Sequence, residues 1–383
     1  MRILICNFEY PPLGGGGGVA TEILARHLAK DHKVVVLTSG GPSLPSEAIE
    51  NNVRVLRVPV LFSRGRATAS IGSMSGYVIM GMRAGRRLLR KTEFDIVNTH
   101  FVLPTGPVGQ FLASRANIPN VLSVHGGDLY EPAKRMSPHR HFLLRVSVRS
   151  LLHSADAVVG QSRNTIDNVH QIYSKEISCE RIPLGIERFP VSHARRADFG
   201  YTDDETLIIT VGRLVPRKAI GSLINIFARI GQDKSRLLIL GDGPEMADLQ
   251  ALSRSLGLES CVDFHGFVDE DKKQDLLRIS DFFASTSRHE GFGLVFLEAM
   301  AAGLPVISYD AGGQVDFLED RNTGFLVALD NEDEFLERCN YLAARRSEGN
   351  LMGKKNEKRV QEFFADRCAD RYSRLFERVI GER

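Results

Sequence analysis

Short apolar runs alternate with helical segments along the chain, which is the pattern of parallel sheets that helices cover on both faces. The first series predicts strands at residues 2–6, 33–38, 53–58, 95–99, 121–124 and 157–160, with a short one near Ile182. Val19 to Lys30 form the best-defined helix between them. The second series predicts strands at residues 207–211, 236–240, 262–265, 281–284, 306–308 and 325–327. We therefore predict an α/β protein with two Rossmann-like domains.

A polar, irregular stretch between Glu187 and Thr202 separates the two series and predicts a linker. We expect domains at residues 1–186 and 203–365, and a C-terminal helix at 366–383 that packs apart from the second sheet. A chain of 383 residues is long enough for two cores. Two such domains would set the ligand loops at their strand ends on opposite sides of one cleft.

Composition excludes several classes of protein. Hydrophobic residues make up 43% and charged residues 25% of the chain, as in soluble proteins, and the net charge of +2 gives no reason to expect a nucleic-acid partner. The five cysteines are scattered without metal-ligand spacing, which predicts reduced thiols and no structural zinc. Met1 leads straight into a strand without a signal peptide, and no apolar stretch reaches membrane-spanning length. We therefore expect a cytoplasmic protein.

Two carboxylates, Glu290 and Glu298, flank a small loop that opens a helix. Gly291 and Gly293 carry no side chain that would block a ligand, and residues 294–300 continue as an apolar helix. Free amides at a helix start attract phosphate, whereas carboxylates accept hydrogen bonds from hydroxyls. The spacing suits a ligand with hydroxyls at both ends and an anionic middle, which describes a nucleoside diphosphate sugar. Taken alone, the two Glu could equally be solvated surface charges.

The stretch from Glu290 to Ile307 has the form Glu-x7-Glu and continues E-A-M-A-A-G-L-P-V-I. It resembles the retaining glycosyltransferases of family 4, and the resemblance spans nearly the whole chain. The resemblance implies the GT-B fold, with the last helix crossing back to the first domain. It also implies transfer of a hexose-type sugar from a nucleoside diphosphate to an acceptor hydroxyl, in glycan, polysaccharide or glycolipid assembly, without an enzymic nucleophile. Glu290 would then bind sugar hydroxyls, and Glu298 would bind the ribose.

Further donor-site elements follow the strands of the second domain. Arg213 and Lys218 match the family's G-R-L-x-x-x-K element and would hold the diphosphate, each charge-assisted bond contributing roughly 1.5–3 kcal/mol. The alternative is a basic helix cap on a solvated turn. Arg217 lies off the pattern, and Asp316 departs from it, because the family usually has Glu at that position. The predicted donor site comprises Gly212, Arg213, Lys218, Gly241, Gly243, Phe267, Val268, Glu290, Gly291, Phe292, Gly293, Leu294 and Glu298.

The glycine run from Gly14 to Gly18 lies between the first strand and the first helix. A nicotinamide-cofactor site would need the glycines directly after the strand and an acidic residue ending the next strand, and neither is present. The run instead resembles the loop by which family members close over acceptor and diphosphate, and its low side-chain content predicts disorder when the site is empty. The acceptor-side residues are Gly15, Gly16, Gly17, Gly18, His100 and Asp128.

His125 follows a predicted strand of the first domain, and family members place a His there against the donor sugar. Its neutral imidazole could donate to a sugar hydroxyl, while its carbonyl stabilises positive charge on the ring. His100, at the end of the preceding strand, either faces the acceptor or is structural, and Asp128 either lies on the acceptor side or only caps the next segment. The predicted catalytic residues are His125, Glu290, Arg213 and Lys218.

Asp269 to Asp271 spell the D-x-D pattern by which another glycosyltransferase fold binds a metal, but they precede a helix and are expected to cap it. Because Arg213, Lys218 and a helix terminus can balance the diphosphate charge, we expect no essential metal and no cofactor. Residues 83–91 and 132–149 mix basic and apolar side chains, so they either contact an anionic membrane or form ordinary solvated helices.

The expected substrates are a nucleotide-sugar donor and a saccharide or lipid-linked acceptor. Other classes of function fit part of the pattern. A glycoside hydrolase could use a carboxylate pair, but it has no use for Arg213 and Lys218 beside it. A sugar-nucleotide epimerase, or a non-catalytic sugar-nucleotide-binding protein on the same fold, would keep the donor elements.

Overall fold

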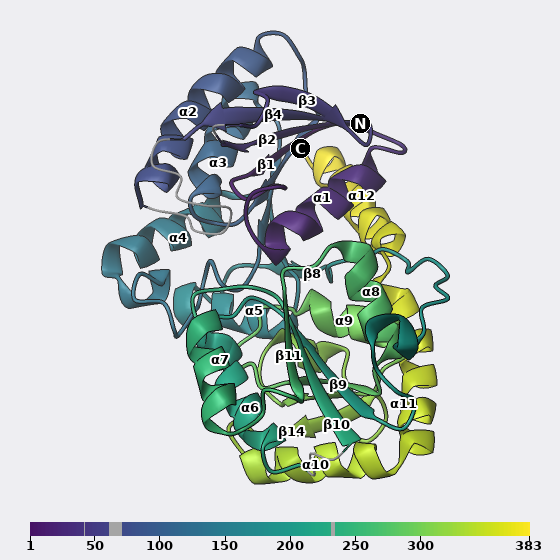
Figure 1. The fold of residues 1–383 in the computed structure, drawn as a ribbon. Helices are drawn as coiled ribbons and strands as arrows, with labels where there is room; N and C mark the ends of the chain where they lie inside the picture. The colour runs from purple at the N-terminus through teal and green to yellow at the C-terminus, as the bar shows by residue number, and fades with distance from the viewer. Residues whose placement is uncertain (42, 61–70, 231–233) are drawn as a thin grey trace. The chain divides into compact units, whose positions relative to one another are not determined.

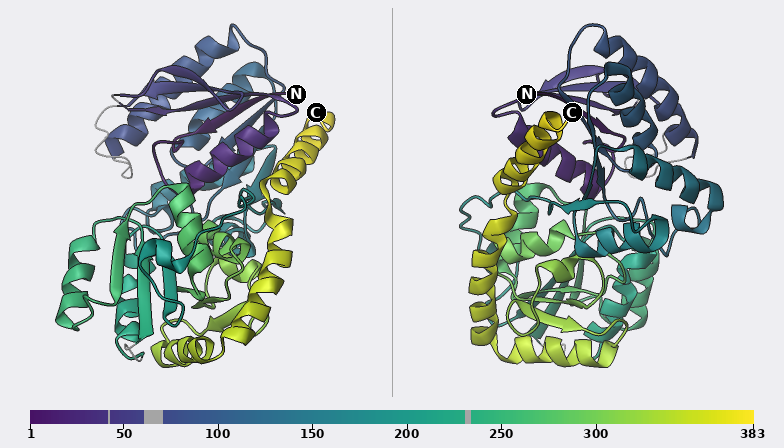
Figure 2. Two further views of the ribbon diagram at one scale, coloured as in Figure 1. Left: turned by 45° about the vertical axis from the view of Figure 1, so that its right-hand side comes forward. Right: turned by 180° about the vertical axis from the view of Figure 1, so that it is seen from behind.

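The computed structural model describes residues 1–41, 43–60, 71–230 and 234–383 and divides them into two compact units (Figure 1; Figure 2). The first unit contains Met1–Glu187 and Phe363–Arg383, and the second contains Arg188–Glu362. Each unit is built on one largely parallel sheet, as the alternating pattern predicts. The boundaries predicted from the sequence treat residues 188–202 as a linker. The structure assigns them to the second unit, where Arg196 donates to the Ile279 carbonyl at 3.0 Å.

The first sheet has eight strands, which are parallel except that the edge strand β3 runs antiparallel to its neighbour. The sequence pattern misses β3 because it is short and its residues alternate between exposed and half-buried. In spatial order the strands are β3 (Glu47–Glu50), β4 (Val53–Pro59), β2 (Lys33–Gly40), β1 (Arg2–Asn7), β5 (Ile96–His100), β6 (Asn120–Val124), β7 (Ala157–Gly160) and β8 (Cys179–Arg181).

Helices cover both faces of this first sheet, as Figure 1 shows. One face packs against α1 (Gly16–Leu28) and α12 (Ala365–Gly381). The opposite face packs against α2 (Ile71–Leu89), α3 (Thr105–Ala116) and α4 (Phe142–Ser154). A shorter helix, α5 (Arg163–Asn168), follows β7. The doubly covered sheet explains why its strands read as short, nearly continuous apolar runs.

The first helix begins inside the glycine run, so the prediction of a loop there is wrong for Gly16, Gly17 and Gly18. Gly15 is the N-cap of α1, and the next three glycines form its first turn. The helix therefore starts three residues before the expected Val19. Glycine is a poor helix former, but a larger residue would not fit at Gly17, where a Cβ would lie 2.4 Å from the ring of Phe101.

The second sheet has six parallel strands. In spatial order they are β11 (Val262–Gly266), β10 (Ser235–Leu240), β9 (Thr206–Val211), β12 (Phe282–Ser285), β13 (Val306–Tyr309) and β14 (Gly324–Val327). Its main core includes α6 (Ile220–Phe227), α7 (Met246–Ser255) and α10 (Glu332–Ala344), and Met352 of α11 (Arg346–Arg359) completes it. Two further helices, α8 (Glu270–Ile279) and α9 (Leu294–Ala301), also pack on this unit.

Neighbouring phenylalanines on β12 show that α9 lies on the other face of the second sheet. Phe282 belongs to the core beneath α6, α7 and α10. Phe283 instead packs edge-to-face on Phe296 of α9, with ring centroids 5.4 Å apart. Successive side chains of a strand point to opposite faces, so this sheet is covered on both sides as well.

The C-terminal helix α12 packs on the first sheet, as the fold class predicts. Tyr372 and Phe376 are buried in one core with Leu24 and Leu28 of α1. The returning chain is held where it enters the first unit, because the amide of Ile186 donates to the carbonyl of Phe363 at 3.0 Å. Helix α12 is therefore part of the core of the first unit, although the second unit separates it in sequence.

Replacing Phe376 by Ala should lower the free energy of unfolding of the first unit by about 3–5 kcal/mol, because the side chain is fully buried. Phe142→Ala removes the same atoms from a side chain that is 77% exposed, and it serves as the matched control. Urea unfolding followed by far-ultraviolet circular dichroism measures both. Equal losses in the two variants would contradict the placement of α12.

Candidate functional site

The loops at the carboxyl ends of β9, β10 and β11 are tied together by their backbones. The amide of Gly212 donates to the carbonyl of Leu240 at 2.9 Å, and the amide of Gly241 donates to that of Gly266 at 2.7 Å. Gly241 has φ +131°, and a Cβ there would lie 1.9 Å from the oxygen of Gly212. A Cβ on Gly243 would lie 2.2 Å from the oxygen of Leu214. These predicted donor-site glycines therefore allow three loops to pack at one sheet edge.

A buried charge cluster lies at the same sheet edge. Lys218 ends a short 3₁₀ helix, Pro216–Lys218, after β9, and its Nζ donates to Glu290 in the loop after β12. Arg217 approaches the other carboxylate oxygen of Glu290 at 3.3 Å and donates to the carbonyl of His289 at 2.9 Å. The structure thus brings together two of the predicted catalytic residues. It adds Arg217, which the family pattern leaves out.

The cluster decides the charge of Glu290. Burial alone raises the pKa of a carboxyl group, but Lys218 and then Arg217 outweigh burial and hold the pKa of Glu290 down at about 2. The side chain of Glu290 is only 6% exposed, so its ionised form depends on these two cations. Glu290 is therefore a buried, permanently charged acceptor at neutral pH.

Gly313, in the loop after β13, helps to hold the Glu290 loop in place. The amide of Gly313 donates to the carbonyl of Glu290 at 2.8 Å, and a Cβ on Gly313 would lie 2.1 Å from the oxygen of Gly291. Gly293 adopts φ +93° as the N-cap of α9, which confirms that a helix begins at Leu294. The motif residues therefore make a rigid turn whose backbone is packed on a neighbouring loop.

The second carboxylate, Glu298, does not join the cluster around Glu290. It pairs with Lys273 of α8 at 2.9 Å, and burial, the largest influence, raises its pKa above the usual range. Phe292 is also a predicted donor residue, but its side chain is buried and packs edge-to-face on Phe317. Phe267 is 80% exposed after β11. Arg213 and Val268 lie in the loops after β9 and β11.

Asp269 is the N-cap of α8, and its carboxylate accepts from the amide of Lys272 at 2.8 Å. This confirms the prediction that the D-x-D pattern caps a helix. Across residues 1–41, 43–60, 71–230 and 234–383, no group of three or more His, Cys, Asp or Glu side chains is arranged to hold a metal ion.

In the first unit, His125 follows β6 and lies against the end of β5. Its Nε2 is 3.0 Å from Nδ1 of His100, and its ring stacks on Phe101 with centroids 4.3 Å apart. Burial lowers the pKa of His125 to about 3 and that of His100 well below its usual value. Both rings are therefore neutral. His100 is buried, and both of its ring nitrogens form hydrogen bonds with other side chains. These contacts favour a structural role for His100 over contact with the acceptor.

Asp128 joins the two loops that carry these rings, so the expected capping of the next segment is wrong. One carboxylate oxygen accepts from the amide of His125 at 2.9 Å, and the other accepts from the amide of Val102 at 2.7 Å. Burial raises the pKa of Asp128 to about 6, although these backbone hydrogen bonds act to lower it. Phe101, between the two loops, has φ +69°, a conformation that a bulky residue adopts only under constraint.

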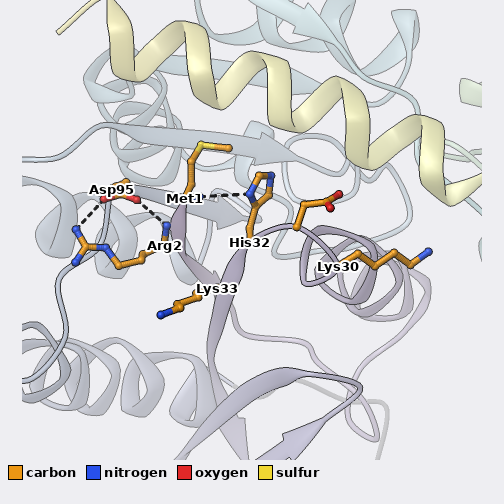
Figure 3. A pocket seen from close by; sticks show the side chains of 7 residues that line it. Met1, Arg2, Lys30, His32, Lys33 and Asp95 are labelled. Atoms are coloured by element: carbon orange, nitrogen blue, oxygen red, sulfur yellow. Dashed lines mark hydrogen bonds and ion pairs between the residues drawn. The ribbon is translucent and has the colours of Figure 1, made fainter.

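A separate cavity of about 470 Å³ lies at the amino ends of β1 and β2 (Figure 3). Figure 3 shows Met1 turned toward His32, with its amino group 3.4 Å from Nδ1, and Arg2 turned toward Asp95, whose carboxylate is 3.0 Å from the guanidinium. Ligands of such sheets bind at the carboxyl ends of the strands, so this cavity is not the candidate active site.

Two family models match the chain, one in each half. A model described as a glycosyl transferase 4-like domain matches residues 15–185, and a model described as glycosyl transferases group 1 matches residues 192–359. Alpha-monoglucosyldiacylglycerol synthase of Acholeplasma laidlawii is 27% identical over 360 residues, which cover 87% of this chain and 86% of that protein.

Solved structures match both units together. Sucrose-phosphate synthase from Thermosynechococcus elongatus has a TM-score of 0.88 at 23% identity, and the match covers 100% of each chain. HepE of Anabaena, in complex with UDP and glucose, has a TM-score of 0.78 at 19% identity, over 98% of this chain and 99% of that chain. At these identities the similarity establishes the two-domain α/β fold.

The two buried glutamates should give opposite pH dependences of stability. The pKa of Glu290 is lowered from 4.5 to about 2, so its contribution is complete above about pH 4.5 and is lost as the pH falls toward 2. Glu290→Gln should therefore destabilise the protein most near neutral pH and progressively less in acid. Urea unfolding of wild type and variant at several pH values measures the difference.

Glu298→Gln is the matched control, because its pKa is raised above 4.5. A carboxyl with a raised pKa destabilises the folded state as the pH increases through the unfolded value, so its pH trend should run in the opposite direction. Parallel trends for the two variants would contradict the charge assignment at Glu290.

Proposed function

Because the chain belongs to the glycosyl transferases of group 1, we propose that it is a retaining enzyme that moves a hexose-type sugar from a nucleoside diphosphate to an acceptor hydroxyl. The observation that carries this proposal is the cluster of buried Lys218 and Glu290 with half-buried Arg217 at the carboxyl edge of the second sheet. Two cations around one buried carboxylate suit a ligand that combines an anionic diphosphate with sugar hydroxyls.

The hydrogen-bonding capacity of Lys218 supports diphosphate binding. An ammonium has three donors, and within the described residues Nζ of Lys218 donates to Glu290 alone. Its remaining donors can serve diphosphate oxygens, with Arg213 in the preceding loop as the second cation. Together they would neutralise the leaving group without an essential metal. Glu290 keeps lone pairs for sugar hydroxyls, and Lys273 holds the Glu298 carboxylate that would receive the ribose.

We propose front-face departure of the diphosphate, in which its oxygen takes the proton of the incoming hydroxyl. The resemblance to the retaining enzymes of family 4 supports this route. His125 and the loops at the carboxyl edge of the first sheet would contact the sugar that is transferred, and its carbonyl would stabilise positive charge on the ring. The anomeric configuration of the product, read by NMR, distinguishes retention from inversion.

A screen of nucleotide sugars by thermal shift and calorimetry tests the donor assignment. We expect selective stabilisation by one of UDP-, GDP- and ADP-sugars, unchanged by chelator, because Lys218 and Arg213 supply the positive charge. Released nucleotide, the acceptor product and any altered sugar are then separated by chromatography. A changed donor without an acceptor product would indicate an epimerase. Absence of binding at millimolar concentration would show that the donor assignment is wrong.

Within the same assay, Glu298→Ala should lower kcat/KM for the donor by about 10- to 100-fold, or roughly 1.4–2.8 kcal/mol. Glu270→Ala is its matched control, because Glu270 also pairs with Lys273, at 3.0 Å, but its side chain is 61% exposed. Undiminished turnover of Glu298→Ala at subsaturating donor would exclude the ribose role.

We propose further that the first unit contacts an anionic membrane surface through α4 and the segment before it. The synthase of Acholeplasma laidlawii makes, by its name, a glucosylated diacylglycerol, and a lipid acceptor has to be reached at a membrane. In the part of the chain that the structure describes, no helix is long and apolar enough to span a bilayer.

Apolar side chains that would reach lipid are exposed at one end of α4. Phe142 is 77% and Leu143 is 76% exposed, with Val146 and Met136 each more than half exposed. Residues 132–154 contain no Asp or Glu, and they carry the basic side chains of Lys134, Arg135, Arg140, Arg145 and Arg149. Arg140 and Arg145 donate to backbone carbonyls, and among the described residues none of the five forms an ion pair. Exposed apolar groups in a segment whose positive charges form no ion pairs match an anionic interface.

The variant Phe142→Ser with Leu143→Ser should reduce binding to vesicles that contain phosphatidylglycerol by roughly tenfold or more, because two apolar side chains no longer insert. Co-sedimentation measures the bound fraction. Ile49→Ser, which alters a 79% exposed side chain on β3, is the control and should bind as wild type does. Equal binding to pure phosphatidylcholine vesicles, or no binding by wild type, would exclude the anionic-membrane proposal.

A further inference from the structure

A chain of hydrogen bonds between buried side chains runs from α12 to His125. The hydroxyls of Tyr372 and Ser123 lie 2.9 Å apart, and Nδ2 of Asn98 donates to Oγ of Ser123 at 3.0 Å. Nε2 of His100 lies 2.7 Å from Oδ1 of Asn98. Nδ1 of His100 then meets Nε2 of His125 at 3.0 Å. All five side chains belong to the first unit.

The orientation of the Asn98 amide is fixed by the backbone. Its Nδ2 also lies 3.1 Å from the carbonyl oxygen of Val121, which can only accept. The amide nitrogen must therefore point toward Val121, and the amide oxygen must point toward His100. An amide oxygen cannot donate, so Nε2 of His100 carries the proton of that bond.

This assignment determines the second ring nitrogen of His100. The ring is fully buried, and within the described residues no carboxylate pairs with it, so a charged imidazolium would be costly there. A neutral imidazole with its proton on Nε2 has a lone pair on Nδ1. Nδ1 of His100 is consequently an acceptor in its bond to His125.

The proton position on His125 follows from the same logic. Nε2 of His125 has to donate to His100, and burial keeps this second ring neutral as well. Its other nitrogen, Nδ1, then bears a lone pair. That atom is buried and has no hydrogen-bond partner within the described residues. A buried acceptor without a donor is unfavourable in the free protein and becomes satisfied when a donor binds.

We propose that Asn98 and His100 are positioning residues that hold the proton of His125 on Nε2, so that its Nδ1 accepts a hydrogen bond from a hydroxyl of the transferred sugar. This inference rests on the proposed function, because it needs a sugar substrate. It reverses the direction expected from the sequence, in which the imidazole of His125 donates to the sugar.

The surroundings hold the ring in the plane that this role requires. Phe101 stacks on His125 with an interplanar angle of 28°. Asp128 fixes the amide of His125, and Gly17 leaves room for the ring of Phe101, which a Cβ would meet at 2.4 Å. The imidazole therefore has its plane, its backbone and its proton set by three independent contacts.

The proton position can be read directly in the free protein. In ¹⁵N NMR spectra of full-length protein labelled at histidine, the protonated and unprotonated nitrogens of a neutral ring resonate in separate regions. The chain has 11 histidines, so His125→Asn identifies the signals of His125 by their loss. We expect Nε2 to be the protonated nitrogen. A proton on Nδ1 of His125 would overturn the proposal.

Two variants test whether His100 sets this state. His100→Gln offers an oxygen to His125 and an amide to Asn98, so it should preserve the proton on Nε2. His100→Leu removes the acceptor and should shift or mix the tautomers of His125. An unchanged spectrum in folded His100→Leu would overturn the positioning role. If that variant does not fold, the wild-type and His100→Gln spectra still decide the proton position.

Analogues of UDP-glucose test whether Nδ1 of His125 accepts a hydrogen bond from the sugar. UDP-glucose is the first probe because UDP and glucose are bound in the similar HepE structure. At the hydroxyl that contacts His125, the monodeoxy and monodeoxyfluoro sugars should both lower kcat/KM by about 3- to 10-fold, because fluorine cannot donate. His125→Ala should abolish the loss at that position alone. Recovery of activity with fluorine would show that His125 donates, and it would overturn the proposal.

These experiments distinguish failure of the proposed function from failure of the inference about His125. If no sugar nucleotide binds, the proposed function fails, while the spectrum of the free protein still reports the proton of His125. If the nucleotide binds and turns over but Nδ1 of His125 is protonated, the proposed function stands and this inference fails.

Discussion

Both sheets bury their faces under helices, and this constraint places the functional side chains of the chain at the carboxyl ends of parallel strands. Loops from several strands have to share each of these edges, so they pack against one another through their backbones. Gly241 shows how tight this packing is, since a Cβ there would collide with the oxygen of Gly212. The glycines of the candidate donor site thus allow the loops to converge, which then places Lys218 next to Glu290.

Titratable groups at the strand ends are buried in both units, and the two units handle them in opposite ways. In the second unit Glu290 stays ionised because Lys218 and Arg217 approach its two oxygens. In the first unit the rings of His100 and His125 are buried, and among the described residues neither ring pairs with a carboxylate, so both stay neutral. The first arrangement keeps a buried carboxylate charged, and the second keeps two buried rings uncharged.

Local patterns predict the strands, the start of α9 and the importance of Glu290, because each depends on neighbouring residues in the sequence. Arg217 escapes prediction because its partner Glu290 lies 73 residues away, and only the fold brings them together. Asn98 looks like an ordinary strand residue, and its role depends on the register that pairs β5 with β6. The early start of α1 is missed because glycine disfavours helices. The need for glycine at Gly17 depends on the ring of Phe101, which is distant in the sequence and close only in the fold.

The glycine run also shows why low side-chain content is an unreliable guide to a ligand loop. Its amides open a helix, which is the usual place for an anion, but the carboxylate of Glu9 already accepts from the amide of Gly15 at 3.2 Å. An anion that approaches this helix would have to displace Glu9. At the same time Gly17 makes room for Phe101, which stacks on His125. In the free protein the run therefore supports the geometry of the histidine, and any closure over a ligand would have to be compatible with that packing.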